Sequence, residues 1–465
     1  MSESHTAELP AGWRTARVGD ILKIRNGYAF KSTDYQEDGA PLIRQSELRS
    51  DVVDTSEAKR VDPKFLTELS GFIIREGDLL IGMSGSLGKI AEYQEKEPAL
   101  QNQRTGLLLL KSGYDAKFAK LVLKFVEPQI VAEGKGVAVQ NVSAKEIEDC
   151  TFALPSPDEQ RRIVAEIEKQ FTRLEAGVVA LRRVQANLNR YRAAVLKAAC
   201  EGRLVPTEAE LAKTGNHKAK LETGESLLTR MLAERQQNWK GRGKYKEPAA
   251  PDTANLPPLP EGWTWASAEQ LCSTVASGST PSADQLFQRD GEVPFIKVYN
   301  LTFGGPLDFS VKPTFISRIV HEGRLGRSKA FAGDVLTNIV GPPLGKVSIV
   351  PDRFPEWNIN QAIVVFRPTG AIFNRLLAFW LRSEAVLARL DCTAKATAGQ
   401  FNIQVTTCRK LALPVPPLAE QARIVAEVER RLSVVEELEA VVFANLQRAL
   451  RLRQSILQKA FSGNF

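Results

Sequence analysis

The sequence contains the same helical phrase twice, far apart in the chain. EQRRIVAEIE occupies residues 159–168 and EQARIVAEVE occupies residues 420–429, with eight of ten residues identical. Further matches follow in the same order: LPAGW at 9–13 with LPEGW at 259–263, APLIRQSEL at 40–48 with VPFIKVYNL at 293–301, GDLL at 77–80 with GDVL at 333–336, LGK at 87–89 and 344–346, and QNQ at 101–103 with INQ at 359–361. The offset grows only from 250 to 261 residues. We infer one long tandem duplication, whose period is far too long for a solenoid.

The divergence between the two copies is uneven. The helical parts match closely, whereas the parts before them share little beyond turn residues. The helices are therefore expected to do one job twice, and the globular parts two related but different jobs.

Length and composition set the class of protein. A chain of 465 residues is too long for one ordinary core, so at least two domains are expected. Its 43% hydrophobic and 25% charged residues are typical of a soluble globular protein. The polar start MSESHTAELP predicts no signal peptide, and no apolar run approaches the ~18 residues that span a bilayer. We expect a cytoplasmic protein with reduced thiols, because its five cysteines are scattered: Cys150, Cys200, Cys272, Cys392 and Cys408.

The parts that precede the duplicated helices are expected to be mixed α/β globules, at residues 17–150 and 267–412. Short apolar runs bounded by Gly, Pro, Asp or Asn have the length of strands. These runs are PLIR, GDLLIGM and RTGLLLLK in the first copy, and VPFIKV, GDVLTNIV and QAIVVFRP in the second. Residues 116–134 and 371–390 have the pattern of amphipathic helices. Trp13 and Trp263 are expected to anchor the cores.

The duplicated helices carry an apolar residue every 3.5 residues on average, which is the period of a coiled coil. Prolines precede both helices and a glycine follows each, at Gly202 and Gly463, as is typical of helix ends. The predicted stripe is Ile163, Ile167, Phe171, Leu174, Val178, Leu181, Val184, Leu188, Tyr191, Val195 and Ala198 in the first helix (159–201), and Ile424, Val428, Leu432, Val435, Leu438, Val442, Ala449 and Ile456 in the second.

These stripes need a partner. We expect the two helices to pair with each other in antiparallel fashion, which would give a two-helix coiled-coil spacer between the globules with pseudo-twofold symmetry. The alternative is that each helix joins a helical bundle of a partner protein. Between the copies, residues 224–239 are expected to form a short helix. The basic stretch KGRGKYK at 240–246 reads as a solvated linker or as a phosphate contact.

The predicted organisation has five segments. They are a first globular domain (1–155), a first spacer helix (156–215), a linker with a short helix (216–258), a second globular domain (259–415) and a second spacer helix (416–465).

The sequence lacks the usual signatures of an enzyme. GSLGKI and GPPLGKV lack the spacing and the final Ser or Thr of a phosphate-binding loop, so we expect β-turns there. The three histidines, His5, His217 and His321, lie near no cysteine pair. VPDRFPEWN lacks the trailing lysine of a nuclease core, and no D/N-P-P-Y/F tetrapeptide of amino-methyltransferases is found. We predict no catalytic residue, no metal site and no cofactor.

Two divergent globules, each followed by a nearly identical long helix, resemble the specificity subunit of Type I restriction–modification enzymes. The resemblance rests on LPSPDEQRRIVAEIE with VPPLAEQARIVAEVE, the two LP-x-GW segments, the paired GD-[LV]-L turns and the helix ends AACEG and AFSGN. It covers essentially the whole chain, with SPDEQ in the first copy where the second has PLAEQ.

This resemblance implies that each globule is a target recognition domain that reads one half of a bipartite, asymmetric site in double-stranded DNA. It implies that the helices form the spacer and bind two methylation subunits, and that motor–nuclease restriction subunits join them. S-adenosylmethionine, ATP and magnesium are then expected on those partner subunits only.

Base reading requires Arg or Lys for guanine and Asn or Gln for adenine, and phosphate contacts require Lys, Arg, Ser or backbone N–H groups. Loop positions with such side chains are the candidate DNA contacts. They are Arg44, Gln45, Ser84, Ser86, Lys89, Gln103, Arg104, Lys135, Gln140 and Asn141 in the first globule, and Lys297, Tyr299, Asn300, Lys346, Asn360, Gln361, Lys395, Gln400 and Asn402 in the second.

Two other classes of function stay open at this stage. One is a coiled-coil structural adaptor without DNA readout, which DNA retardation in the presence of the partner subunits would discriminate. The other is a DNA-modifying enzyme of unrecognised design, which binding of S-adenosylmethionine or metal by the isolated chain would favour.

Overall fold

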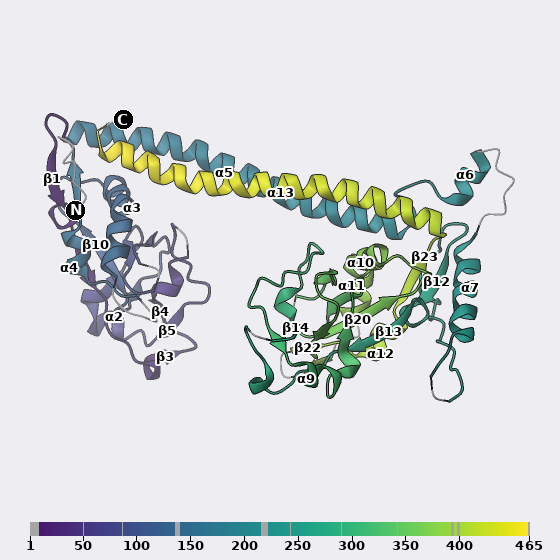
Figure 1. Ribbon diagram of the computed structural model, residues 1–465. Helices are drawn as coiled ribbons and strands as arrows, with labels where there is room; N and C mark the ends of the chain where they lie inside the picture. The colour runs from purple at the N-terminus through teal and green to yellow at the C-terminus, as the bar shows by residue number, and fades with distance from the viewer. Residues whose placement is uncertain are drawn as a thin grey trace. The chain divides into compact units, whose positions relative to one another are not determined.

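The chain folds into two compact units. The computed structural model describes residues 9–49, 51–85, 87–134, 140–214, 222–241, 243–289, 291–341, 343–391, 395–397 and 400–463. Unit one comprises Met1–Arg182 with Val442–Phe465, and unit two comprises Arg183–Val441. The two long helices are each divided between the units, so the compact units do not follow the five sequence segments (Figure 1).

Unit one contains two principal sheets and a two-stranded ribbon. A four-stranded antiparallel sheet has the order β2-β10-β7-β8, and a five-stranded mixed sheet has the order β3-β5-β4-β9-β6, in which β4 and β9 are parallel. The ribbon pairs β1 with β11. The strands are β1 (Arg14–Arg17), β2 (Leu22–Asn26), β3 (Tyr35–Gln36), β4 (Ala40–Ile43), β5 (Lys59–Val61), β6 (Ile73–Ile74), β7 (Leu79–Gly82), β8 (Ile90–Glu92), β9 (Ala99–Gln101), β10 (Thr105–Leu110) and β11 (Thr151–Leu154), and the helices are α1 (Val18–Ile21), α2 (Phe65–Glu68), α3 (Ala116–Glu133) and α4 (Ala144–Asp149).

Unit two repeats this plan. Its four-stranded sheet β13-β20-β17-β18 and mixed sheet β15-β14-β19-β16 have the same strand orders as the corresponding strands of unit one, and β14 and β19 are again parallel. The strands are β12 (Thr264–Ser267), β13 (Cys272–Ser277), β14 (Val293–Ile296), β15 (Phe315–Ile316), β16 (Lys329–Ala330), β17 (Val335–Asn338), β18 (Val347–Ile349), β19 (Trp357–Ile359), β20 (Ile363–Pro368), β21 (Lys395–Thr397), β22 (Gln400–Asn402) and β23 (Ala412–Val415), and the helices are α8 (Ala268–Leu271), α9 (Arg318–Glu322), α10 (Asn374–Arg382), α11 (Glu384–Asp391) and α12 (Val405–Lys410). The duplication is therefore structural as well as sequential.

Each of the six apolar runs predicted as strands contains a buried strand: β4, β7, β10, β14, β17 and β20. The expected single helix at 371–390 is instead broken into α10 and α11. Ser383 has an extended backbone conformation at the end of α10, and its N–H and Oγ both donate to Trp380 O, at 3.0 and 2.7 Å. These two bonds satisfy the carbonyl group of Trp380 in the last turn of α10, and the helix ends there.

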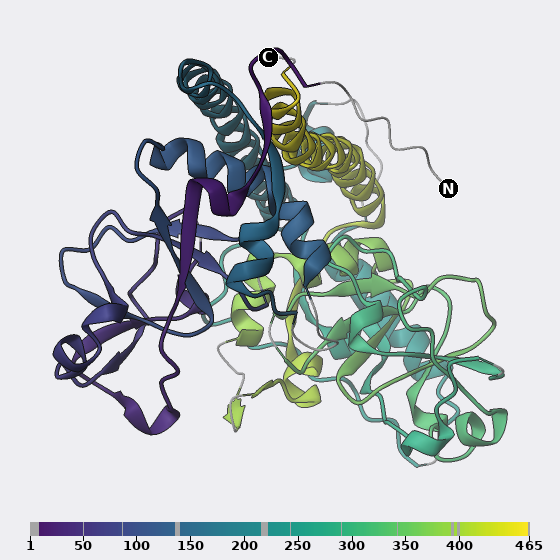
Figure 2. The same cartoon turned by 90° about the vertical axis from the view of Figure 1, so that its left-hand side faces the viewer.

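The duplicated helices are α5 (Pro157–Cys200) and α13 (Leu418–Phe461), 44 residues each. Within each unit, the segments of α5 and α13 lie side by side in both views (Figures 1 and 2). In unit one Arg453 pairs with Glu175 at 3.6 Å, and in unit two Arg192 pairs with Glu439 at 2.7 Å. Glu175 of α5 thus pairs with Arg453, and the later residue Arg192 pairs with the earlier residue Glu439. The two helices are therefore antiparallel, as predicted.

The buried face of the helices belongs to the cores of the globules. Ile163, Ile167 and Phe171 join the core of unit one together with Ile456 and Phe461 from the far end of α13. Correspondingly, the core of unit two contains Val195, Leu196 and Ala199 from the end of α5 together with Ile424, Val428 and Leu432 from the start of α13. Each globule is thus completed by the beginning of one helix and the end of the other.

Most of the predicted stripe is buried or half-buried, including Leu188, Val435 and Val442, with Leu174 and Leu181 half-buried. Three members are exposed, and their prediction as seam residues is wrong: Val184, Tyr191 and Leu438. A pair of helices buries only a narrow strip on each partner, and these three side chains lie beside it.

The other duplicated motifs meet at the ends of the helices. Gln160 Nε2 donates to Pro155 O at 3.0 Å and Gln421 Nε2 donates to Pro416 O at 3.0 Å, so the same glutamine closes the start of both helices. Trp263 is buried, and its Nε1 donates to Glu420 Oε1 at 2.9 Å. Burial raises the pKa of Glu420, although this bond and the N–H of Glu208 stabilise its charged form.

The glycines that follow the two helices pack on the LP-x-GW segments. Gly202 and Gly463 both have positive φ, of 66° and 75°, as expected for a helix C-terminus. A Cβ added at Gly202 would lie 2.4 Å from Pro260 Cγ, and one at Gly463 would lie 2.1 Å from Pro10 Cγ. The glycine that ends each helix therefore packs on the LP-x-GW segment of the other copy, where a larger residue would not fit.

The connector is only partly a linker. It contains α6 (Glu208–Thr214) and α7 (Gly224–Gln237), and α7 packs on unit two through Leu227 and Leu228. Arg235 of α7 donates to Glu269 O at 2.7 Å and to Cys272 O at 3.1 Å. The predicted short helix is therefore part of unit two. None of the described helices combines the length and hydropathy needed to cross a bilayer.

A charge in the shared core should unfold the unit that contains it. We expect Ile167→Asp to destabilise unit one and Val428→Asp to destabilise unit two by about 2–5 kcal/mol, because a buried carboxylate has no partner there. Chemical denaturation of the full chain measures the change. The matched controls Ala165→Asp and Ala426→Asp lie two residues earlier on the exposed side of each helix. Equal stability of core and control variants would show that the helix face is not buried.

Candidate nucleic-acid interface

Unit one contains a polar cavity of about 630 Å³, formed by the loops that follow β4 and β9 with contributions from neighbouring loops. Five of the predicted DNA contacts line it: Arg44, Gln45, Lys89, Gln103 and Arg104. Sequence reasoning missed Asn102, the central residue of the QNQ motif, and Arg49, which follows the predicted cluster at 44–45. The structure therefore gathers residues from three separate sequence segments around one concave surface.

The backbone of the loop after β9 is held in place by neighbouring segments. Asn102 Oδ1 accepts the N–H of Arg104 at 3.2 Å, and Asn102 O accepts the N–H and hydroxyl of Thr105 at 3.0 and 2.8 Å. The Gln103 N–H donates to Tyr28 O at 2.9 Å. A Cβ added at Gly27 would lie 2.2 Å from Asn102 O, so the two loops approach as closely as glycine allows. Gln103 and Arg104 are thus exposed side chains on a fixed backbone.

A further pair of segments lies next to Gln45. The N–H of Gly85 donates to Gln140 O at 2.7 Å, and Ser84 forms a β-bridge with Asn141. Gln45 lies against Gly85, since a Cβ added there would lie 3.0 Å from Gln45 Nε2. Ser84 itself is only 3% exposed, so its side chain cannot reach DNA and the prediction for Ser84 is corrected. Ser86 and Lys135 lie outside the described residues.

Unit two repeats this arrangement. Asn360 N–H donates to Ile296 O at 3.1 Å, as Asn102 N–H donates to Ile43 O at 3.0 Å in unit one. A Cβ added at Gly278 would lie 2.2 Å from Asn360 O, which reproduces the close approach at Gly27. Gln361 is exposed and accepts a hydrogen bond from the hydroxyl of Thr280.

Asn300 is a second correction. Its side chain is fully buried, its Oδ1 accepts the Lys297 N–H at 2.9 Å, and its Nδ2 donates to Asp308 O and Val311 O at 3.0 and 2.9 Å. No polar atom of Asn300 is left for a base, so its role is structural. Glu47 caps the N–H of Arg44 at the matching position of unit one, at 2.8 Å.

The other candidates of unit two differ in their surroundings. Lys297 and Lys346 are half-buried, and Lys346 Nζ lies 5.8 Å from the centre of the Phe303 ring. Tyr299 is exposed, and its hydroxyl donates to Lys312 O at 3.2 Å. Asn402 is exposed at the end of β22 and forms a β-bridge with Val340. The side chains of Lys395 and Gln400 lie outside the described residues.

One cluster in unit two has residues of metal-ligand type, namely His321, Glu322 and Glu356. Lys329 Nζ lies 2.7 Å from Glu322 and 3.3 Å from Glu356, and Arg318 also pairs with Glu356. The carboxylates are therefore already neutralised by cations, and the cluster is an ion-pair network. Among the described residues it is the one group of this kind.

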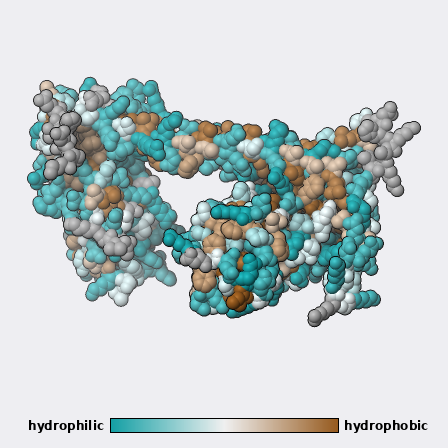
Figure 3. Space-filling view, viewed as in Figure 1, coloured by the Kyte–Doolittle hydropathy of each residue, from teal (hydrophilic) through white to brown (hydrophobic). Residues whose placement is uncertain are grey.

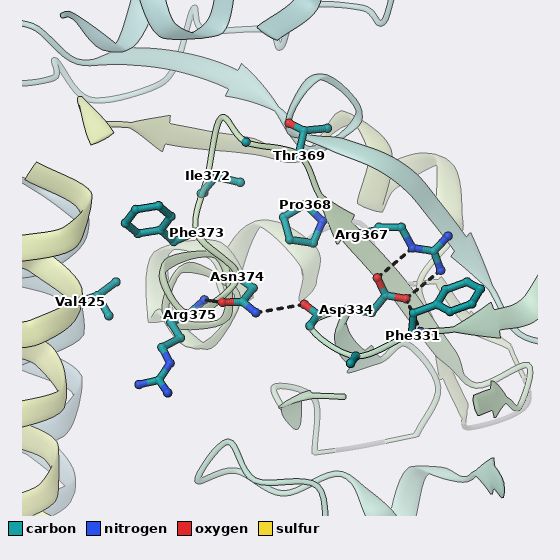
Figure 4. A pocket seen from close by; sticks show the side chains of 13 residues that line it. Phe331, Asp334, Arg367, Pro368, Thr369, Ile372, Phe373, Asn374, Arg375 and Val425 are labelled. Carbon is teal, nitrogen blue, oxygen red and sulfur yellow. Dashed lines mark hydrogen bonds and ion pairs between the residues drawn. The ribbon is translucent and has the colours of Figure 1, made fainter. Parts of the chain in front are cut away.

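A further cavity of unit two, of about 570 Å³, lies between the loop before β17 and the start of α10 (Figure 4). Arg367 donates to both oxygens of Asp334, at 2.9 and 2.8 Å, and Arg375 pairs with Glu429. The two guanidinium groups at this cavity are thus paired with carboxylates, so the cavity offers little to a phosphate group.

The helices of unit two carry an apolar strip that is not part of any core. Its exposed members are Val184, Tyr191, Val434, Leu438 and Val441. The hydrogen bond to Glu427 raises the pKa of Arg430, and the nearby Tyr191 adds a small part to this shift. Arg430 is one turn before Val434. The opposite side of α13, at Leu432 and Glu436, faces α10 across another cavity. This outer strip therefore points away from the globule, and hydrophobic residues are visible along the helix surface in Figure 3.

Comparison with known proteins identifies a family. Residues 10–178 and 260–437 match the family model described as Type I restriction modification DNA specificity domain. The chain is 25% identical over 460 residues to the specificity subunit of the Type I restriction enzyme EcoBI of Escherichia coli, which covers 97% of this chain and 86% of that protein. It is 24% identical over 480 residues to the EcoKI specificity subunit of Escherichia coli (strain K12), covering 98% of this chain and 90% of that protein.

A solved structure supports the fold. A chain from a study of complex assembly and conformational transition in the type I R-M system matches 99% of this chain and 100% of its own length, with a TM-score of 0.60 and 20% sequence identity.

Buried His321 should make unit two sensitive to mild acid. Burial lowers the pKa of His321 below its ordinary value, and the neighbouring Lys329 adds to this effect. As the pH falls, His321 is protonated in the unfolded state before it is protonated in the folded state. The free energy of unfolding should therefore fall as the pH drops through about 6.5. Urea unfolding at pH 7.5 and at pH 5.5 measures the loss.

The variant His321→Gln isolates this effect. It should be less stable than the wild type at pH 7.5, because the contact of His321 Nδ1 with Asn358 Nδ2, at 3.0 Å, is altered. Its stability should change less between the two pH values. If the variant loses as much stability between pH 7.5 and pH 5.5 as the wild type does, the pKa of His321 is the same in the folded and the unfolded protein.

Proposed function

This chain belongs to the family of Type I restriction–modification DNA specificity subunits, and we propose that each of its units reads one half of a bipartite, asymmetric DNA site. The observation that carries this proposal is the pair of equivalent loops after β9 and β19. Their backbones are fixed by the same contacts, at Gly27 with Asn102 and at Gly278 with Asn360. Both loops carry an Asn-Gln pair, but the next residue is Arg104 in one and Ala362 in the other, so the two loops present different sets of donors to base edges.

The charges in unit one fit a polyanion. Arg44, Arg49, Lys89 and Arg104 surround the polar cavity, and the side chains of Lys89 and Arg104 have no hydrogen bond or ion pair within the described part of the chain. Unpaired cations on a concave surface attract phosphate groups, which supply most of the non-specific affinity for DNA. The whole chain is also basic, with a net charge of +8.

The outer strip of the helices fits a partner protein. An apolar strip on a rigid helix pair is a typical docking surface for further helices, because its burial provides the free energy of association. We propose that it contributes to the binding of methylation subunits, and that motor–nuclease subunits join this assembly. The chain itself is proposed to be non-catalytic and cytoplasmic, with S-adenosylmethionine, ATP and magnesium held by those partners.

The two competing functions make different predictions. A structural adaptor would bind partners without retaining DNA, which the unpaired side chains of Lys89 and Arg104 at the cavity argue against. An enzyme would need a nucleophile, an acid–base pair or a metal site. The ion-pair network at His321 uses its carboxylates internally, and burial raises the pKa of the described cysteines Cys150 and Cys408 to about 11 and about 12.

Exchange of one unit should alter one half of the target. We expect replacement of residues 1–155 by the matching segment of a relative to change one half-site only, because the contacts with bases lie in the exchanged loops. Residues 163–171 and 456–461, which complete the core, stay in place. Methylome sequencing of cells that express the chimera with its methylation subunit reads the result. Exchange of 259–415 is the reciprocal control, and a change of both half-sites in either chimera would contradict the modular model.

A charge on the outer strip should weaken assembly without unfolding the unit. We expect Val434→Glu and Leu438→Glu to reduce co-purification of the methylation subunit about tenfold or more, since each buries an unpaired carboxylate in the interface. The control Ala440→Glu adds the same charge at an exposed position of α13 off the strip. Thermal unfolding should be alike for all three. Full assembly of the strip variants would show that methylation subunits bind elsewhere.

A further inference from the structure

Three arginines line the cavity of unit one, and their pairing distinguishes them. Arg44 Nη2 donates to Glu47 at 2.9 Å. Arg49 pairs with Asp54 at 3.3 Å and with Glu57, and the hydrogen bond to Glu57 raises the pKa of Arg49. The exposed guanidinium of Arg104 has no such partner within the described residues. Arg104 therefore has both edges of its donor fork available to a ligand.

The backbone of Arg104 is fixed although its side chain is not. Its N–H donates to Asn102 Oδ1 at 3.2 Å, and its carbonyl oxygen accepts the N–H of Met83 at 3.1 Å. These two bonds tie it to the loop after β9 and to the end of β7. A side chain on a fixed backbone loses less freedom when it binds, and its position relative to a base is reproducible.

The matching position of unit two has no such group. Asn102 and Gln103 correspond to Asn360 and Gln361 in the duplicated motif, which places Ala362 opposite Arg104. Arg104 is thus one point at which the two readers differ in chemistry while their loop backbones agree.

We propose that Arg104 is a specificity-determining residue of unit one and that it reads a guanine through bidentate donation to O6 and N7 in the major groove. This inference rests on the proposed function and assigns a base to it. Arginine to guanine is the commonest specific contact, because the guanidinium fork matches the two acceptors of that base. Lys89, a single unpaired ammonium at the same cavity, contacts phosphate instead.

The half-site of unit one therefore contains a G·C pair that depends on Arg104. The loop of unit two, with Ala362, makes no guanine contact at the equivalent position. Asn and Gln side chains favour adenine, so Gln103 beside Arg104 is suited to a neighbouring A·T pair.

The test uses the full chain assembled with its methylation subunit. Methylome sequencing first gives the target, and equilibrium binding at one salt concentration is then measured on duplexes in which each base pair of the target is replaced in turn. The wild-type complex should lose about tenfold to a hundredfold in affinity when the guanine read by unit one is replaced. The Arg104→Ala complex should bind all four base pairs at that position alike and keep its discrimination elsewhere.

Two further variants separate base reading from charge. Arg104→Lys keeps the charge without the fork, so it should keep more of the overall affinity than Arg104→Ala but only part of the discrimination. Lys89→Ala should weaken binding alike on every duplex and lower the salt dependence by about one counterion. Arg75→Ala removes an exposed arginine outside the cavity and serves as the control.

The outcomes decide between the two levels of inference. The role of Arg104 is overturned if the Arg104→Ala complex still discriminates at every base pair, or if it loses affinity equally on all duplexes. Either result leaves the proposed function standing. A wild-type complex that does not distinguish its target from a scrambled duplex overturns both.

Discussion

The fold depends on one packing arrangement. The core of each globule contains the start of one long helix and the end of the other. Phe461, near the end of the chain, stacks on Phe125 with ring centres 4.8 Å apart and also contacts Phe118 and Phe152. Val195, Leu196 and Ala199 take the corresponding part in unit two. The globules cannot be closed by their own continuous sequence, so the helices must return to them.

This arrangement explains why the helical phrases have stayed alike in both copies. Each helix has to fit a globule at its beginning and a globule at its end, and it packs along the other helix between. The glycine after each helix must fit against Pro10 or Pro260, and the glutamine at each start must reach a proline carbonyl. A substitution in the helix must therefore remain compatible with several packing contacts at once. A substitution in a loop after β9 or β19 affects few contacts.

Much of this could be predicted from the sequence. The duplication, the six apolar strands and the two long helices follow from local patterns, and the match to the family model confirms the family inferred from the duplicated motifs. The cavity in unit one gathers five of the predicted contacts. Four of them follow the neighbouring parallel strands β4 and β9, whose carboxyl ends meet at one edge of the sheet. Local patterns could not show that the helix ends belong to the cores, since this depends on tertiary contacts between distant segments.

The corrected residues show where such patterns fail. Asn300 has a side-chain amide of the kind that binds bases, but this amide is buried and its Oδ1 accepts the backbone N–H of Lys297. Tyr191 fits the coiled-coil period, yet a two-helix contact is too narrow to bury it. Side-chain type and spacing give a list of candidates, and only burial and pairing divide it into groups that hold the fold and groups that remain available to a ligand.

That division also bears on how such a protein can change its target. The loops after β9 and β19 are held by backbone hydrogen bonds and by the close approach of Gly27 and Gly278, none of which involves the side chains of Gln103, Arg104 or Gln361. Surface substitutions away from buried contacts usually alter stability by little. An exchange at residues 103–104 should therefore alter the donors and acceptors offered to DNA at small cost to the fold. A rigid loop with replaceable side chains is a physical reason for two readers of one architecture to recognise different sequences.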